Sequence, residues 1–381
     1  MGTPIVILGA GPAGSAAALT LRRYLPELEV VLVERHTATA PSRAPSEHVG
    51  VPGAARPRSV PGRSTVGETL SPGILPLLGY LDLRDSFLAE GHLPAAGTAS
   101  AWGSDQVLER HYLFTGRGQG WHVDRTRLDA WLQEQAQAAG ASLLQGELRE
   151  VVRTDTGFEL DLGDRSVSAS ALIDATGRSA RLARSLGASV AMDDALVARA
   201  CWYTVQDTEQ TAEGALIESM SEGWWYSATL PGGRAVQMLM SDVSTFRAEA
   251  ADFDGFWQRC LDMASATRAR TRGWQATGEV VVRPAHSQRT TTVYGQRWVA
   301  AGDAAAAFDP LASLGIGFAL RSGIEAARVV AASLEGDDAT GAAYAESIER
   351  IYQDYLERLR RLYALETRWK QPGFWQRRAE R

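Results

Sequence analysis

The chain has 381 residues, of which 45% are hydrophobic and 22% charged, and its net charge is −6. This length allows one large or two ordinary domains with a substantial core. The negative charge gives no reason to expect nucleic acid or an anionic membrane as a partner. No uninterrupted apolar run approaches the roughly 18 residues that a membrane-spanning helix requires, so no membrane segment is predicted.

The two cysteines, Cys201 and Cys260, are far apart and lack the spacing of a metal site. No metal centre is therefore expected. The first apolar run lacks the basic leader and the cleavage site of a signal peptide. Together these features predict a reduced, cytoplasmic setting.

A glycine-rich turn follows the first predicted strand. Residues 4–8 (PIVIL) are typical of a buried parallel strand, and the sequence Gly9-Ala10-Gly11-Pro12-Ala13-Gly14 leads from it into a helical segment. A second apolar strand ends at Glu34, twenty residues after Gly14. In a dinucleotide fingerprint the glycines make the turn, admit the pyrophosphate and let helix pack on strand, while the acid binds ribose hydroxyls. The strand–turn–helix context favours this interpretation over a glycine turn without a ligand.

The next hundred residues contain a long loop and a second group of strands. Residues 36–62 are rich in Pro, Arg, Ser and Gly and are interpreted as a surface loop, either a lid or an excursion without function. Residues 63–72 return to the sheet, a helix is predicted over 73–83, and residues 93–102 and 107–113 are expected in a second sheet. Residues 121–132 predict a strand that enters a helix capped by Asp124. Arg125 or Arg127 could reach a phosphate there, or could lie at a solvated helix start.

Residues 141–162 suggest a small meander, and residues 171–177 (ALIDATG) repeat the order of strand, acid and glycine with Asp174 and Gly177. Residues 195–242 alternate apolar and polar side chains, which predicts an antiparallel sheet that could roof a ligand. Helices are expected over 252–266 and, as a long Arg- and Glu-rich tail, over 342–368.

The stretch 298–320 (WVAAGDAAAAFDPLASLGIGFAL) organises the second half of the chain. A strand ends at Gly302-Asp303, a turn contains Pro310, and Gly315-Ile316-Gly317 begins a helix. The start of a helix presents unpaired N–H groups and a positive dipole end, and an acid at a strand end can bind a polyol. This combination fits FAD better than NAD.

The three motifs, in this order, resemble the FAD-dependent monooxygenase superfamily of glutathione-reductase-like fold over roughly residues 1–330. Finer details look like the branch that holds flavin-dependent tryptophan halogenases, geranylgeranyl reductases and tryptophylquinone-maturing flavoproteins: VGETL (66–70), VDR (123–125), GWWY (223–226) and FDPLASLGIG (308–317). The resemblance implies that the first motif binds the ADP half of FAD. It also implies that Arg125 lies near the cofactor, that Asp303 contacts the ribityl chain, and that the 315–317 helix start faces the flavin pyrimidine edge. The predicted cofactor site comprises Gly9, Gly11, Pro12, Ala13, Gly14, Glu34, Arg35, Arg63, Arg125, Asp174, Gly177, Gly302, Asp303, Pro310, Gly315, Ile316 and Gly317.

The halogenase residues are absent. Halogenation needs a lysine after the Gly-Glu motif, but the segment HLPAAGTAS (92–100) has none and Lys370 is the only lysine in the chain. Ala312 stands where the resemblance implies a halogenase glutamate, and residues 224–228 depart from the Trp-x-Trp-x-Ile-Pro signature.

The sequence therefore predicts an FAD-dependent monooxygenase, not a halogenase, that hydroxylates an indole-like group through a flavin C4a-hydroperoxide. The substrate is an aromatic small molecule or a tryptophan-containing peptide or protein. Trp224, Trp225, Tyr226, His92 and Trp102 are the candidates for positioning it, with ordinary core packing as the alternative for each aromatic. A small-molecule oxidase or hydroxylase, an isoprenoid-type reductase and a non-catalytic flavoprotein chaperone stay open, as does the electron donor, either NAD(P)H or a separate flavin reductase.

The predicted fold class is α/β, with a Rossmann-like FAD-binding domain, an inserted antiparallel-sheet substrate domain and a C-terminal helical tail. The FAD-binding domain is expected to comprise residues 1–80, 105–190 and 275–340. The substrate domain is expected to comprise residues 81–104 and 191–274, and the tail residues 341–381.

Overall fold

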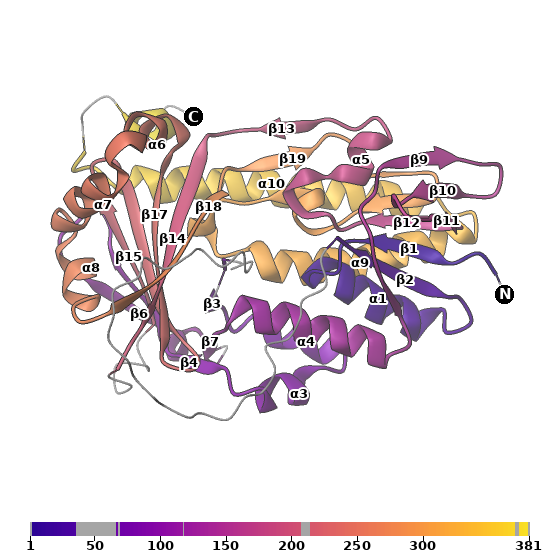
Figure 1. The fold of residues 1–381 in the computed structure, drawn as a ribbon, viewed down its shortest axis with the longest axis horizontal. Helices are drawn as coiled ribbons and strands as arrows, with labels where there is room; N and C mark the ends of the chain where they lie inside the picture. Colours follow the sequence, from indigo (N-terminus) through magenta and orange to yellow (C-terminus); the bar gives the residue numbers. More distant parts are fainter. Residues whose placement is uncertain are drawn as a thin grey trace.

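The computed structural model of the protein describes residues 2–35, 66–67, 69–116, 118–206, 214–369 and 373–379. The predicted loop 36–62, the candidate Arg63, Glu68 of the VGETL segment and Lys370 lie outside these residues. Two large sheets lie at opposite ends of the long axis, and one long helix runs past both of them (Figure 1).

The first sheet has six strands in the order β20-β21-β12-β1-β2-β8, all parallel except the edge strand β20. Its strands are β1 (Ile5–Leu8), β2 (Val30–Glu34), β8 (Ser142–Gln145), β12 (Ala171–Asp174), β20 (Tyr294–Gly295) and β21 (Trp298–Ala300). The central strands are buried and, apart from Asp174 at the end of β12, apolar, as a parallel sheet covered on both faces requires. The carboxyl ends of β1, β2, β12 and β21 therefore meet at one edge.

Helix α1 (Pro12–Tyr24) packs between α4 (Arg125–Ala138) and α9 (Gly315–Leu334) against this sheet (Figure 1). Small residues allow α1 and α9 to approach closely, because a Cβ atom at Gly323 would lie 2.2 Å from the carbonyl oxygen of Ala13. The short helix α5 (Arg181–Ser185) follows β12. A separate antiparallel meander is formed by β9 (Glu150–Arg153), β10 (Phe158–Asp161) and β11 (Ser166–Ala169).

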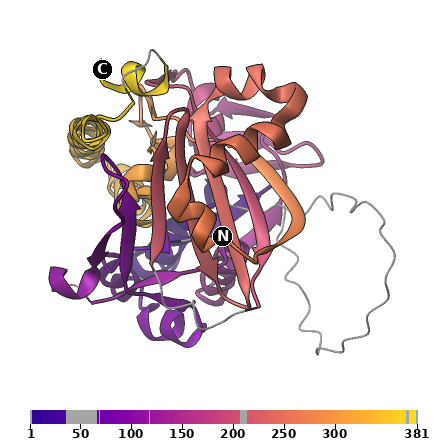
Figure 2. The same ribbon diagram turned by 90° about the vertical axis from the view of Figure 1, so that its left-hand side faces the viewer.

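The second sheet has seven strands in the order β18-β14-β17-β16-β15-β5-β6, antiparallel except between β15 and β5. Its strands are β5 (Gly97–Ala101), β6 (Leu108–His111), β14 (Leu196–Thr204), β15 (Ala215–Met220), β16 (Gly223–Leu230), β17 (Arg234–Asp242) and β18 (Gln275–Pro284). Three helices cover one face of it, as Figure 2 shows: α6 (Val243–Ala248), α7 (Phe253–Asp262) and α8 (Ser265–Arg270). The opposite face joins the large core that contains the parallel sheet.

Smaller elements connect the two sheets. One three-stranded sheet is formed by β3 (Thr69–Leu70), β7 (Gly120–His122) and β4 (Leu93–Ala95), and it packs with α2 (Ile74–Tyr80) and α3 (Arg84–Ala89). Another is formed by β13 (Val190–Met192), β19 (Gln288–Thr290) and β22 (Ala306–Ala307).

The C-terminal segment is part of the core. Helix α10 (Ala339–Ala364) passes alongside α9 and both sheets, and α11 (Phe374–Ala379) returns to the seven-stranded sheet (Figures 1 and 2). Tyr344 donates a hydrogen bond to the carbonyl of Ala300 in the parallel sheet, at 2.7 Å. At the other end of α10 the indole of Trp102 donates to the carbonyl of Leu362, at 2.8 Å. This helix thus ties the two sheets together.

The predicted α/β class is confirmed, and most predicted strands and helices are present. One local prediction was wrong: residues 142–145 join the parallel sheet as β8, and the meander is completed by β11 instead. The seven-stranded sheet includes β6, as expected for residues 107–113, and also β18, which lies within the range 275–340 predicted for the FAD-binding domain. A strand's sheet is chosen by long-range pairing, which local alternation does not encode.

Candidate functional site

The glycine motif forms an open cradle where β1 meets α1. Gly9 has φ +102°, and a Cβ there would lie 2.1 Å from the carbonyl oxygen of Ala175. A Cβ at Gly14 would lie 1.9 Å from the carbonyl oxygen of Gly9, whereas a Cβ at Gly11 would meet no atom within 4 Å. Packing therefore requires the first and third glycines, and the second leaves free space in front of the helix. No side chain caps α1 and Pro12 begins it, so its N–H groups face this space, as a pyrophosphate site requires.

Glu34 lies at the end of β2 beside this cradle. Its Oε2 accepts a hydrogen bond from the backbone N–H of Ala10, at 2.9 Å. The carboxylate is thus held at the edge of the sheet, where ribose hydroxyls would meet it. Arg35 points elsewhere, because its guanidinium pairs with Glu147 at 3.2 Å and both side chains are more than half exposed.

Asp303 follows β21 at the same edge of the sheet. Its carboxylate lies 3.7 Å from the guanidinium of Arg178, and its side chain is 37% exposed. Arg178 is fixed by hydrogen bonds to the carbonyls of His286, at 2.6 Å, and Phe308, at 3.2 Å. Burial raises the pKa of Asp303, while Arg178 and Arg125 lower it. Asp303 is therefore an oriented acceptor at the mouth of the site, next to the positive φ of Gly302.

Arg125 begins α4 and reaches toward the start of α9. Its guanidinium donates to the carbonyl of Val66, at 2.8 Å, and pairs with Asp129 one turn along the helix, at 3.1 Å. A Cβ at Gly67 would lie 2.8 Å from Arg125 Nη1 and 3.9 Å from the side chain of Ile316. Burial raises the pKa of Asp129, and Arg125 opposes that rise. Arg125 therefore lies between residues 66–67 and the start of α9, and its nearness to the cofactor stays a prediction.

The start of α9 is exposed on the same side. Its N-cap residue, Leu314, makes no side-chain cap, and a Cβ at Gly315 or Gly317 would meet nothing within 4 Å. Free backbone N–H groups at the start of a 20-residue helix suit an anionic or electron-rich ring edge. Pro310 begins the short turn before this helix, and Asp309 caps that turn by accepting from the N–H of Leu311, at 2.9 Å.

Asp174 is predicted to belong to the cofactor site, but its carboxylate is hydrogen-bonded to the turn and helix that follow β12. It is fully buried, and its carboxylate accepts from the N–H and hydroxyl of Thr176 and from the N–H of Ala183, at 3.0, 2.6 and 2.8 Å. Burial raises its pKa, and these hydrogen bonds oppose that rise. Its carboxylate therefore holds the turn that contains Gly177, whose φ is +67°, and does not point into the cradle.

Strand alternation divides the aromatic candidates of β16 between two faces. Trp225 packs under α7, where its indole donates to the carbonyl of Cys260 at 3.3 Å and its ring lies 4.6 Å from that of Trp257. Trp224 faces the large core but is only 1% exposed, and it packs against Trp102. The structure thus leaves neither tryptophan open to a substrate, and Trp225 lies on the face away from the cofactor residues.

Tyr226 belongs to a polar chain that sequence reasoning missed. Its hydroxyl lies 2.6 Å from the hydroxyl of Thr69, which lies 2.9 Å from Nδ1 of the fully buried His122. Thr69 follows closely after Gly67, so this chain lies between the second sheet and the Arg125 region. Only the HxD spacing before the helix start could have drawn attention to His122, because the three residues are far apart in sequence.

His92 lies apart from this chain. Its ring packs at a tilt of 38° against Phe87 with centroids 4.5 Å apart, and Phe87 packs edge-on against Trp121. Since Trp121 and His122 point to opposite faces of β7, His92 lies on the face away from Tyr226. Burial lowers the pKa of His92 to about 4, so this imidazole is neutral at physiological pH. The structure gives His92 a packing role rather than an acid–base role.

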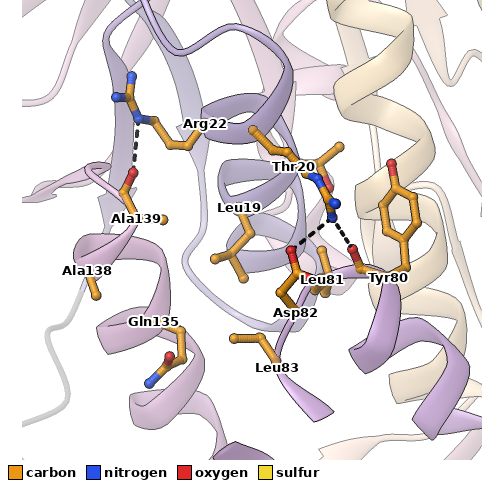
Figure 3. Close-up of a pocket in the computed structure, with 11 residues that line it drawn as sticks. Leu19, Thr20, Arg22, Tyr80, Leu81, Asp82, Leu83, Gln135, Ala138 and Ala139 are labelled. Atoms are coloured by element: carbon orange, nitrogen blue, oxygen red, sulfur yellow. Dashed lines mark hydrogen bonds and ion pairs between the residues drawn. The ribbon is translucent and has the colours of Figure 1, made fainter. Parts of the chain in front are cut away.

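A cavity of about 340 Å³ lies between the last turns of α1 and α4 and the turn that joins α2 to α3 (Figure 3). Arg23 and Asp82 form a 3.1 Å ion pair beside it. None of its lining residues is a predicted site residue, and it lies at the end of α1 opposite to Gly11. It is therefore separate from the cofactor cradle.

Within the described ranges, no His, Cys, Asp and Glu side chains cluster in a way that could hold a metal ion. In the same ranges no helix is long and apolar enough to cross a membrane.

Comparisons with known proteins relate the chain to flavin-dependent enzymes. The model of the tryptophan halogenase family matches residues 105–381, and that of the pyridine nucleotide-disulphide oxidoreductases matches residues 3–188. LodB of Marinomonas mediterranea, which is named an FAD-dependent oxidoreductase, is 30% identical over 98% of this chain and 96% of its own length. The peptidyl tryptophan dihydroxylase QhpG superposes with a TM-score of 0.74, at 27% identity, over 100% of this chain and 79% of its own. The flavin-dependent halogenase CmlS gives a TM-score of 0.82 at 23% identity, over 99% of this chain and 68% of its own, which shows a shared fold.

Proposed function

Because the chain belongs to the tryptophan halogenase family and is an FAD-dependent oxidoreductase, we propose that it is a monooxygenase that hydroxylates a tryptophan-like aromatic group. FAD would be held by the 9–14 cradle and Glu34 at its ADP half, and by Arg125, Asp303 and the 315–317 helix start at its flavin half. Once reduced, bound FAD supplies the reaction with O2 that delivers one oxygen atom to a substrate.

The lysine content argues against halogenation within this family. The only lysine is Lys370, and the segment in which the family places its halogenating lysine contains β4 and β5 with no lysine at all. Arginine cannot replace it, because a guanidinium stays protonated and offers no free amine. The chain thus has the fold of the family but lacks the lysine that halogenation needs.

The chain of Tyr226, Thr69 and His122 is the observation that carries the proposal. Hydroxylation adds oxygen to a ring carbon and then removes the proton from that carbon, so the site must accept one proton. Two hydroxyls that end at a buried imidazole offer such a route from the substrate side of β16 to β7. The aromatic cores around Trp224 and Trp225 would stiffen this wall and exclude water, without contacting the substrate.

The similarity to a peptidyl tryptophan dihydroxylase, which extends over all of this chain and 79% of the other, supports an indole, in a peptide or free, as the group oxidised. Halogenation is the rival function, since the family model and most similar proteins are halogenases. Electrons would come from NAD(P)H or from a separate flavin reductase, and the setting would be cytoplasmic.

The test is a single-turnover reaction of the purified holoprotein. The enzyme is reduced without oxygen and then mixed with O2, bromide and either free tryptophan or a tryptophan-containing peptide. We expect a product that has gained oxygen, and a flavin absorbance transient whose decay is accelerated by the substrate. A brominated product would establish halogenation instead, and reoxidation that releases stoichiometric peroxide regardless of any aromatic would refute both.

A further inference from the structure

A chain of buried polar groups joins the end of α10 to the loop that precedes α9. The indole of Trp224 donates to the hydroxyl of Tyr363, at 3.2 Å, and that hydroxyl donates to Oδ2 of Asp309, at 2.7 Å. On the other side, the backbone N–H of Asp309 donates to the hydroxyl of Tyr355, at 2.8 Å. All four side chains are buried. Two tyrosines of α10 therefore hydrogen-bond to one residue, Asp309, at the start of the loop.

The loop needs such support because its backbone is strained. Ser313 has φ +52°, a conformation that a non-glycine residue keeps only when its surroundings fix it. Before it, Oδ1 of Asp309 holds the N–H of Leu311. After it, Leu314 offers no side-chain cap to α9. The direction in which the N–H groups of residues 315–317 point thus depends on how residues 309–314 are held.

We propose that Tyr363 is a positioning residue of the cofactor site, whose hydroxyl holds the Asp309 carboxylate and thereby aims the N–H groups of residues 315–317 at the flavin. The proposal rests on FAD binding at this helix start and not on whether the product is hydroxylated or halogenated. Tyr363 itself acts from behind the loop, through Asp309.

The direction of these hydrogen bonds makes the arrangement dependent on charge. An indole can only donate, so the hydroxyl of Tyr363 must donate onward to Asp309. An ionised Asp309 accepts that bond, but a protonated one would place a second donor against the same hydroxyl. Lowering the pH through the range where Asp309 titrates should therefore loosen the loop.

Charged and polar neighbours set that range. Burial raises the pKa of Asp309 to about 6, and nearby Asp194 adds to the rise. The hydroxyl of Tyr363, the N–H of Leu311 and the guanidinium of Arg378 all lower it. Arg378 lies over the Tyr363 ring, 5.3 Å from its centroid, and pairs with Asp242 of β17. Removing the Tyr363 hydroxyl should therefore move the Asp309 titration to higher pH.

The experiment compares Tyr363→Phe with Tyr344→Phe in the full chain. Tyr344 is the control, because it is buried on the same helix and its phenylalanine variant loses one hydrogen bond, to the carbonyl of Ala300, whereas Tyr363→Phe loses two. Amide hydrogen exchange of residues 310–318 is measured on the apoprotein, and FAD affinity is measured by flavin fluorescence across the acidic and neutral range. Tyr363→Phe should accelerate exchange in this segment, weaken FAD binding about tenfold at neutral pH and shift the midpoint of its pH dependence upward. Tyr344→Phe should change none of these three quantities.

Equal exchange, affinity and midpoint in Tyr363→Phe and wild type would overturn the proposal. If Tyr363→Phe fails to fold, Asp309→Asn provides the decision, because an amide does not titrate. In its apoprotein, the exchange protection of residues 310–318 should lose the transition near pH 6, and a transition that persists in this segment would overturn the proposal as well. None of these measurements uses substrate, so their failure is distinguishable from a failure of the proposed hydroxylation.

Discussion

Separate alanine variants of Gly11 and Gly14 should distinguish an effect on FAD affinity from an effect on the stability of the fold. A Cβ at Gly14 would lie 1.9 Å from the carbonyl oxygen of Gly9, so α1 must move away from the turn. Overpacking of this kind costs about 3 kcal/mol, and we expect Gly14→Ala to unfold at lower urea concentration even without FAD. A Cβ at Gly11 meets no protein atom within 4 Å, and its φ of −72° suits alanine.

The stability of apo Gly11→Ala should therefore stay within about 0.5 kcal/mol of wild type. Its new methyl group would occupy the space that the pyrophosphate needs, so FAD affinity should fall about 10- to 100-fold. Urea unfolding of the apoproteins and titration with FAD measure the two effects separately. Unchanged FAD affinity in Gly11→Ala would refute the placement of the pyrophosphate at this helix start.

Three further changes test the proposed proton route and the stability of the fold. Tyr226→Phe should keep the fold but lower kcat about 10- to 100-fold. The control Tyr203→Phe on β14 should leave kcat unchanged. Equal kcat values in Tyr226→Phe and wild type would show that Tyr226 is not part of the proton route. The pKa of His92 falls on folding from 6.5 to about 4, so the fold has its full stability where His92 is neutral, above pH 6.5. About 2–3 kcal/mol of the free energy of unfolding should be lost as the pH falls from 6.5 through 4. Urea titrations of His92→Leu should not show that loss. Burial alone would raise the pKa of Glu366, but hydrogen bonds from Arg368 and Ser219 bring it down to about 2. Glu366→Gln should therefore lower the free energy of unfolding by about 3 kcal/mol above pH 4.5 and by progressively less toward pH 2. Acid unfolding curves of the variant and the wild type would reveal this difference.

Much of the cofactor site follows from the sequence because its residues are local in the chain. The turn at 9–14, the acid at the end of the next strand and the helix start at 315–317 are each encoded within a few residues. Parallel strands bring their carboxyl ends together, so the sequence predicts that these segments meet at one edge. Gly11, Glu34 and Asp303 lie at the carboxyl ends of β1, β2 and β21, and Arg125 begins α4; that these four residues bind the cofactor stays a prediction.

The tertiary structure decided which way the side chains of β16 and Asp174 point. The composition of β16 marks Trp224, Trp225 and Tyr226 equally, but pleating sends Trp225 under α7 and leaves its neighbours on the other face. The carboxylate of Asp174 turned to its own backbone, because a buried charge needs the nearest donors.

The polar chains were likewise out of reach of sequence reasoning. Thr69, His122 and Tyr226 come from three separate strands, and Tyr363 reaches Asp309 across 54 residues. No local pattern specifies such partners; they meet because α10 and two sheets pack around one core. The sequence by itself determined the strand–turn–helix motif at residues 9–14 that predicts a flavin dinucleotide site. Only the packing of distant elements decided which side chains meet in the two polar chains, since side-chain direction depends on the neighbours that burial provides.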